Sequence, residues 1–223
     1  GLAGTLDDFL EAKRSASWRS KERRKERRLA DHGEVRFVLA RRPEEIDAIL
    51  PEMMRQKSRS YRDLGVTDLF AVPGYREFVT ALTREHTADG FVFLCAIEVG
   101  ERLEATYWGV VHARRFYHLL PTYAVDELTR YAPGNVLLRR MFEWCLANGI
   151  EVFDFTSGDD EYKAAWCDRS LLLYDYFEGV TARGKVRVAM TRGQRSTKKR
   201  IKRSPVLLDY ARRVRARVGG RLR

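Results

Sequence analysis

Three apolar runs between residues 91 and 125, separated by very short polar turns, constrain the fold of this 223-residue chain more than any other feature. The runs are FVFLCAIEV, RLEATYWGVVHA and FYHLLPTYAV, and Gly100-Glu101 and Arg114-Arg115 separate them. Apolar, β-branched and aromatic runs joined by such turns are typical of adjacent antiparallel strands. The centre of the chain is therefore predicted to be an antiparallel meander.

A helix and a further strand are predicted to follow the meander. Residues 134–147 place apolar side chains on one face, Gly149 suits the left-handed position beyond a helix end, and residues 150–158 begin with an apolar run. Strand, helix and strand in this order form a right-handed parallel crossover in nearly all proteins. Pro121 has no N–H, so we expect the third meander strand to bulge or to part from a neighbour there. The helix then starts where open α/β sheets bind ligands.

One strand and two helices are predicted before the meander. The strand covers residues 34–40, Pro43 opens the first helix, and Pro73-Gly74 precede the second. Their apolar stripes are Ile46, Ile49, Leu50, Met53 and Met54 in the first helix, and Tyr75, Phe78, Val79 and Leu82 in the second. The polar segment 56–65 between them is expected to be irregular and to cover or line a cleft.

Further elements are predicted at both ends of this α/β core. Residues 158–166 suggest a short helix, and residues 171–179 and 185–190 suggest a closing pair of strands. Near the N-terminus, Thr5 and Asp8 have the spacing of a capping box, and a mixed-charge helix follows.

Charge is distributed unevenly along the chain. Residues 183–223 hold 16 Lys and Arg and one acidic residue, whereas residues 34–182 hold 17 basic and 24 acidic residues. The net charge of +11 therefore comes from the ends. Two partners are open for residues 195–223: an anionic membrane surface, which suits a terminal helix with an apolar and an arginine-rich side, and a tRNA. Packing of this helix back onto the domain is equally open.

Several classes of protein are disfavoured by the composition. The chain has no run of about 18 apolar residues and no apolar core of a signal peptide, so we expect a cytoplasmic protein, either free or peripheral to the membrane. Cys95, Cys145 and Cys167 are widely spaced, which favours buried free thiols over a metal site. His112 and His118 lie on adjacent predicted strands without a third ligand, and we expect ordinary sheet histidines.

The start of the helix at residue 134 is the first candidate binding site. Its first N–H groups, on Gly134, Asn135 and Val136, are expected to point outward, and aligned peptide dipoles add partial positive charge there. Gly134 carries no side chain, and Arg130 can add a charge-assisted contact. A diphosphate fits this description, although a plain helix cap explains the residues as well.

Residues 131–166 resemble the GNAT acyltransferase superfamily, in the branch associated with cellulose and other exopolysaccharide synthesis and related to the Fem-type aminoacyl transferases. The residues that carry the resemblance are Tyr131, Pro133 and Gly134, then Phe153, Asp154, Phe155, Gly158, Asp159, Tyr162, Lys163 and Trp166. Element order extends the resemblance over residues 34 to about 182. It implies an α/β fold whose mixed, mostly antiparallel sheet has a central, splayed pair of parallel strands, flanked by helices.

Three regions follow from this resemblance. Residues 1–33 are expected to form a charged helix that links to a missing preceding domain. Residues 34–190 are expected to form the GNAT-like acyltransferase domain, and residues 191–223 a basic linker and an amphipathic helix.

The resemblance also implies the activity. An acyl-CoA donor and an amine acceptor are expected to react by direct attack, without a metal, in polysaccharide or cell-envelope synthesis. The donor's pantetheine is expected along the strand ending near Tyr123 and Val125, and its diphosphate at the helix start. Pro133 and Asn135 depart from the superfamily's small-residue loop, which leaves open a Fem-like transfer from aminoacyl-tRNA. A non-catalytic scaffold that binds nucleic acid or membrane is a third alternative.

Five residues are candidates for the acid–base chemistry that this implied reaction needs. Asp126 or Glu127 is the expected base, with Asp154 and Asp159 as rivals, although a loop surface or a helix cap accounts for each equally well. Tyr162 is the expected acid for the leaving thiolate, because a phenol stays protonated at neutral pH. Lys163 is expected to hold substrate or phosphate, or to be plain helix surface. For Asp154, a structural hydrogen bond is the favoured role.

Overall fold

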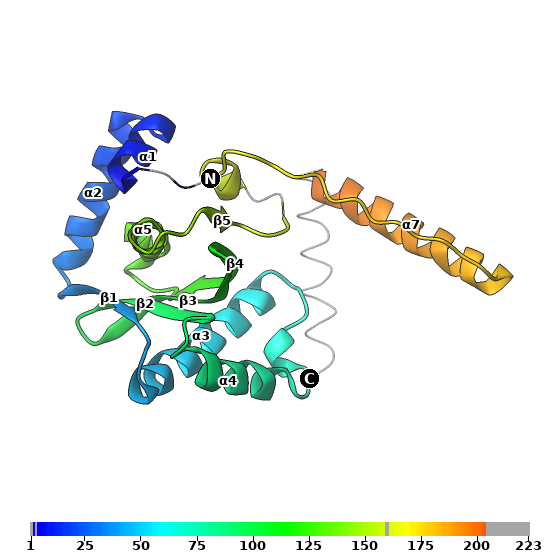
Figure 1. Cartoon of the computed structure of the whole chain (residues 1–223), viewed down its shortest axis with the longest axis horizontal. Coiled ribbons are helices and arrows are strands. Elements are labelled where there is room, and N and C mark those ends of the chain that lie inside the picture. Colours follow the sequence, from blue (N-terminus) through cyan, green and yellow to red (C-terminus); the bar gives the residue numbers. More distant parts are fainter. Residues whose placement is uncertain (1, 3, 159–160, 204–223) are drawn as a thin grey trace. The chain divides into compact units, whose positions relative to one another are not determined.

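A computed structural model describes residues 2, 4–158 and 161–203 (Figure 1). The chain forms two compact units, the first of residues 1–62 and 67–168, the second of residues 63–66 and the residues after 168. The first unit contains the sheet, and each unit is described by itself below.

The sheet of the first unit has five strands in the order β1-β2-β3-β4-β5. They are β1 (Val35–Leu39), β2 (Val92–Val99), β3 (Arg102–His112), β4 (Arg115–Tyr123) and β5 (Val152–Asp154). The first four pair antiparallel, and β4 pairs with β5 in parallel. The predicted meander and the parallel crossover are confirmed, although β5 is shorter than the expected strand over residues 150–158.

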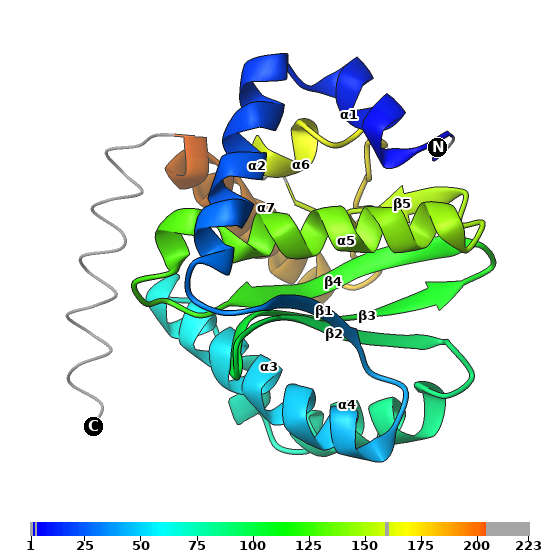
Figure 2. The same ribbon diagram turned by 90° about the vertical axis from the view of Figure 1, so that its left-hand side faces the viewer.

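Helices cover both faces of this sheet (Figure 2). Helix α5 (Pro133–Ala147) lies on one face, and α3 (Pro43–Asp63) and α4 (Tyr75–His86) lie on the other. Each face has its own core, since β2 and β3 alternate side chains between the two. The predicted stripe of α3 is buried, whereas in α4 Val79 is buried, Tyr75 and Leu82 are partly buried and 57% of Phe78 is exposed. Gly149, with φ of +66°, ends α5 as expected.

The N-terminal segment is two helices rather than one. The capping box of Thr5 and Asp8 opens α1 (Leu6–Lys13), and Ser15 caps α2 (Ala16–Ala30). Both helices belong to the first unit, and Leu10 and Leu29 are buried. Their apolar side chains pack on α5, and the link to a preceding domain stays a prediction.

The prediction of an irregular segment over residues 56–65 is wrong for most of its length, because α3 continues to Asp63. The polar side chain of Gln56 is fully buried and hydrogen-bonded, to Glu52, to the carbonyl of Leu103 and to the hydroxyl of Thr106. A polar residue is therefore part of the helix–sheet interface here. The expectation that the segment lines a cleft is confirmed, since Ser58 lines a pocket.

The prediction of a closing pair of strands over residues 171–179 and 185–190 is also wrong. Residues 171–180 have no regular structure, and α7 (Ala182–Arg203) follows in the second unit. Lys, Arg, Ala and Met favour helix over residues 182–190, which outweighs the alternation of KVRVAM. Without those strands the parallel pair lies at the edge of the sheet and not at its centre.

The short helix predicted near residue 162 is present as α6 (Glu161–Ala164), and Trp166 behind it is buried. Asp159 lies outside the described residues. The terminal helix over residues 204–223 also lies outside them, as do the side chains of residues 194–203, so the membrane or tRNA partner stays a prediction. No helix in the described ranges has an apolar stretch long enough to cross a bilayer.

Candidate active site

Strands β4 and β5 pair over a short distance and then part. Three residue pairs are in register, of which the last is Tyr117 with Asp154, whereas β4 continues to Tyr123. One step beyond this pair, the Thr156 hydroxyl donates to the carbonyl of His118 at 3.2 Å, so a side chain replaces the backbone ladder. The outer half of β4 therefore has a neighbouring strand on one side only.

Of the two outcomes expected near Pro121, a bulge or a parting from a neighbour, the parting is present, since Pro121 lies in the half of β4 beyond its pairing with β5, and the bulge lies elsewhere. Pro121 stays in register with Tyr107 of β3, and the irregularity falls between Trp108 and Val110. There the Tyr107 hydroxyl enters the space beside Gly109 and donates to the carbonyl of Tyr117 at 2.6 Å. A side chain at Gly109 would collide with that hydroxyl, which explains the glycine.

Two cationic side chains of α3 cover the free edge of β4. The Lys57 ammonium donates to the carbonyl of Pro121 at 3.0 Å, and the Arg59 guanidinium donates to the carbonyl of Tyr123 at 2.7 Å. Because Pro121 also lacks an N–H, this edge offers few backbone groups to a ligand. A pantetheine arm that pairs here must replace these bonds.

The start of α5 is less open than the sequence predicts. Ala132, with φ of +54°, directs its carbonyl into the helix, where it accepts from the Asn135 N–H at 2.9 Å and from the Val136 N–H at 3.4 Å. Val136 makes the first regular helical bond, which an expectation of three free amides overlooks. Among the described residues, only the Gly134 N–H of the three has no acceptor.

The surroundings of the Gly134 N–H partly suit an anion. No side chain lies within 4 Å of a Cβ built on Gly134 except the Tyr123 ring, at 3.7 Å. The exposed Arg130 guanidinium lies 5.0 Å from the ring centroid of Tyr131. The Asn135 amide, however, donates at 3.1 Å to the buried carboxylate of Glu22. A phosphate therefore fits on the Gly134 and Arg130 side, and Glu22 bounds the site with negative charge.

Asp126 and Glu127 share one counter-ion. The guanidinium of Arg102 lies 2.6 Å from Asp126 and 2.7 Å from Glu127, and 2.9 Å from Glu104. Hydrogen bonds with Arg102 lower the pKa of Glu127. Asp126 also accepts from the Leu128 N–H at 2.8 Å, so it shapes the loop that leads to α5. Both candidates are therefore engaged in holding this loop.

Glu104 is a buried acid that the sequence analysis did not single out. Only 1% of it is exposed, and burial, followed by the charge of Asp126, raises its pKa to about 7. No hydrogen bond from a described residue reaches its Oε2 atom when the carboxyl is ionised. A glutamate in a strand between Leu103 and Ala105 is a weak signal, because alternation alone places it on a solvated face.

We predict that Glu104 makes folding stability fall as pH rises. The folded state holds its proton more tightly than the unfolded state, whose pKa is near the model-compound value of 4.5. This contribution is complete below pH 4.5 and is lost as pH rises through about 7. Glu104→Gln is therefore expected to gain about 1–2 kcal/mol over the wild type between pH 5 and pH 8, measured by urea unfolding.

Glu127→Gln is the matched control, because it removes a carboxylate from the same arginine. Folding lowers the pKa of the Glu127 carboxyl, so the wild type gains stability from this group as pH rises from 3 to 6. The glutamine variant lacks this gain and is expected to lose stability relative to the wild type over the same range. Equal pH profiles for the two variants would contradict the assignment of the raised pKa to Glu104.

Residues from β4, from the chain after β5 and from α6 meet where the parallel strands part. The Phe155 ring lies 5.1 Å from the ring of His118 and 6.1 Å from that of Tyr162. Lys163 donates to the carbonyl of Ser157 at 3.0 Å. Tyr162, 43% exposed, is therefore on the same side of the parting as His118.

Asp154 has the structural role that the sequence analysis favoured. It accepts from Arg115 at 2.9 Å and from the Thr156 N–H at 2.8 Å. The ionic and backbone bonds tie the end of β5 to β4, so this carboxylate stabilises the point of parting.

His118 differs from the expected ordinary sheet histidine. Its ring is stacked on Tyr107 at 5.1 Å and only 4% of the residue is exposed, yet its nitrogens bond to none of the described side chains or backbone groups. Burial, and then the charges of Lys163 and Lys57, lower its pKa to about 3. It is a neutral imidazole, and its missing partner is a three-dimensional property that the sequence does not signal.

The candidate residues occupy two separate ends of the same region. Tyr123 is five positions after His118 on β4, which is about 17 Å at the usual rise of a strand. Tyr162 and Lys163 are at the inner end, whereas Asp126 and Gly134 are at the outer end. No three His, Cys, Asp or Glu side chains in the described part of the chain are grouped as metal ligands would be.

Comparison with known proteins agrees with this geometry. A family described as "Acetyltransferase (GNAT) domain" matches residues 16–164, which include α2, the whole sheet and α5. A search of curated proteins found no match. The matched range includes the mixed sheet with its parallel pair. It also includes the parting of β4 and β5 and the start of α5. The chain belongs to the GNAT acetyltransferase family, and it is an acyltransferase.

Proposed function

We propose that the chain transfers an acyl group from acyl-CoA to the amine of a small molecule. The observation that carries this proposal is the parting of β4 from β5 beside a helix start whose Gly134 N–H bonds to no acceptor in the described part of the chain. The outer end of the parting offers an N–H, a helix dipole and Arg130 for phosphates. The inner end offers Tyr162 and a neutral His118.

The two ends are assigned to two parts of one donor. We place the diphosphate at Gly134 and Arg130, and the thioester about 17 Å away near His118. When bound, acyl-CoA supplies an activated carbonyl that an amine attacks directly. Tyr123 and Val125, both exposed, then lie along the arm that joins the two parts.

Tyr162, exposed at the inner end, is proposed to give its phenolic proton to the departing sulfur, and the proton that the attacking amine releases restores the phenol through solvent. His118 is proposed to donate its N–H to the carbonyl oxygen. A neutral imidazole donates a hydrogen bond without proton exchange, and burial, followed by the charges of Lys163 and Lys57, keeps it neutral.

Asp126 and Glu127 are proposed to hold the donor loop. They lie at the outer end of β4, too far along the strand to reach a centre beside Tyr162. Arg102 offsets part of their negative charge there, which reduces repulsion of a diphosphate. The proposed acceptor is an amine of a polysaccharide or envelope precursor, and the likeness of residues 131–166 to that branch supports it.

Calorimetric titration tests the donor assignment. Acetyl-CoA and longer acyl-CoAs are expected to bind, and acyl-pantetheine, which lacks the diphosphate, is expected to bind at least about tenfold more weakly. The affinity for acyl-CoA is expected to fall with added salt, because the contacts at Arg130 are exposed. Absence of binding by every acyl-CoA at low salt would refute the proposal.

A further inference from the structure

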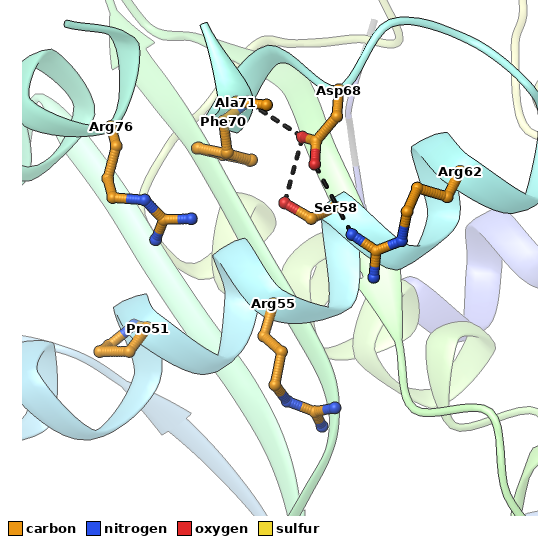
Figure 3. A pocket seen from close by; sticks show the side chains of 8 residues that line it. All are labelled: Pro51, Arg55, Ser58, Arg62, Asp68, Phe70, Ala71 and Arg76. Carbon is orange, nitrogen blue, oxygen red and sulfur yellow. Dashed lines mark hydrogen bonds and ion pairs between the residues drawn. The ribbon is translucent and has the colours of Figure 1, made fainter. Parts of the chain in front are cut away.

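A pocket on the outer side of α3 lies apart from the residues assigned to acyl transfer. It is open to solvent and has a volume of about 450 Å³, and residues of α3, of η1 (Leu69–Ala71) and of the first turn of α4 line it (Figure 3). The lining side chains used below are those of Arg55, Ser58, Arg62, Asp68, Phe70 and Arg76. This volume is within the usual range for small-molecule sites.

Three guanidinium groups from two helices line this pocket. Arg55 and Arg62 belong to α3 and lie on one side of it with Ser58, since these positions are three and four residues apart. Arg76 comes from α4, and Figure 3 shows its side chain extending from that helix toward the space in front of Ser58. Arginine is the side chain best suited to phosphate and carboxylate groups.

Of the three guanidinium groups, that of Arg76 has N–H donors available for a ligand. Its Nη1 atom lies 3.2 Å from the sulfur of Met54, and its guanidinium lies 5.8 Å from the centroid of Phe70. Sulfur is a weak acceptor, and within the described ranges no carboxylate forms an ion pair with Arg76. Most of its five N–H donors therefore face water or the pocket.

The acidic groups nearby are occupied by other partners. Asp68 accepts from the Ser58 hydroxyl at 3.1 Å and from the Phe70 N–H at 3.0 Å, and Arg62 lies 3.8 Å away. Arg55 is held by Glu52 through two hydrogen bonds, of 2.7 and 2.6 Å. Three guanidinium groups against two carboxylates leave the pocket with a net positive charge.

We propose that this pocket binds a small molecule through an oxyanion group, a phosphate or a carboxylate. Arg76 makes the charge-assisted contact, and Arg62 adds a second one because its bond to Asp68 is long. The buried ring of Phe70 with Pro51 supplies an apolar surface for the body of the ligand. The pocket uses none of the residues assigned to the donor, so either proposal can fail without the other.

Inorganic phosphate is the probe for a test with the full chain. At constant ionic strength, with chloride as the balancing anion, phosphate is expected to bind with a dissociation constant in the millimolar range, measured by calorimetry or by the rise in Tm. Arg76→Gln is expected to weaken phosphate binding by about tenfold or more, which corresponds to one charge-assisted hydrogen bond.

Arg84→Gln is the matched control. Arg84 is on the same helix, is exposed and is paired with Asp47 at 2.6 Å, and its loss changes the net charge equally. Phosphate affinity is expected to be unchanged in this variant. Acetate in place of phosphate distinguishes a carboxylate site from a phosphate site.

Two results would overturn the proposal: no binding of phosphate or acetate to the folded chain, or equal weakening by Arg76→Gln and Arg84→Gln. The circular dichroism spectrum of Arg76→Gln is expected to match that of the wild type, because the side chain is exposed. Titration of Arg76→Gln with acyl-CoA distinguishes failure of this proposal from failure of the proposed function, since the affinity of the variant for acyl-CoA is expected to be unchanged.

Discussion

Gly134→Asp is expected to abolish measurable acyl-CoA binding without destabilising α5. A carboxylate at this position lies in the first turn of the helix, beside the N–H of residue 134 that is assigned to the phosphates. Helix α5 has no acidic residue in its first turn, so the interaction of the new carboxylate with the helix dipole stabilises the folded state by about 0.3–1 kcal/mol. Replacement of a glycine within the helix adds a similar amount. The same charge repels a diphosphate. Binding is expected to fall by about 100-fold or more, measured by calorimetry, while Tm rises.

Gly134→Ala is the control for size without charge. A Cβ at residue 134 meets only the Tyr123 ring, at an ordinary contact distance of 3.7 Å, and the backbone there needs no glycine conformation. Alanine is therefore expected to change donor affinity by less than about threefold. Acyl-CoA binding by the aspartate variant at wild-type affinity would place the phosphates elsewhere.

Tyr162→Phe is expected to lower kcat by about 10²- to 10⁴-fold, because it removes the proton donor for the leaving thiolate and keeps the ring. The ring contact with Phe155 remains, so KM for the donor is expected to change little. Steady-state kinetics with a thiol-detecting assay measure both constants. A donor with a more acidic thiol leaving group is expected to recover part of the lost rate, which a structural defect would not allow.

Tyr174→Phe controls for loss of a phenol at a surface. Tyr174 is 86% exposed and belongs to the second unit, so its kcat is expected to equal that of the wild type. If Tyr162→Phe raises KM for the donor and leaves kcat unchanged, Tyr162 is a binding residue and not the acid.

The elements that the sequence predicts well are those whose pattern depends on near neighbours. The turns at Gly100 and Arg114, and the glycine after α5, act over a few residues, so local rules place the strands and helices beside them. Residues 56–63 have a polar composition that such rules assign to a loop. Gln56 is helical and buried because Leu103 and Thr106, far away in the chain, satisfy its amide.

The same division holds for the candidate site. Gly134 can be predicted because Pro133 and Gly134 mark a helix start. The roles of Asp126 and Glu127 cannot, because their common partner Arg102 is about 24 residues earlier and meets them only through the pairing of β3 with β4. His118 looks like any buried histidine until three dimensions reveal that no residue in the described ranges bonds to its ring nitrogens.

Helix α3 is a shared component of two surfaces, and this has a thermodynamic consequence. Lys57 and Arg59 hold the edge of β4, and Ser58 and Arg62 face the arginine pocket. A donor that displaces the first pair alters the same turns of helix that position the second. If an anion in the arginine pocket shifts this segment and so changes the affinity for the donor, reciprocal linkage requires that the donor change the affinity for the anion by the same factor.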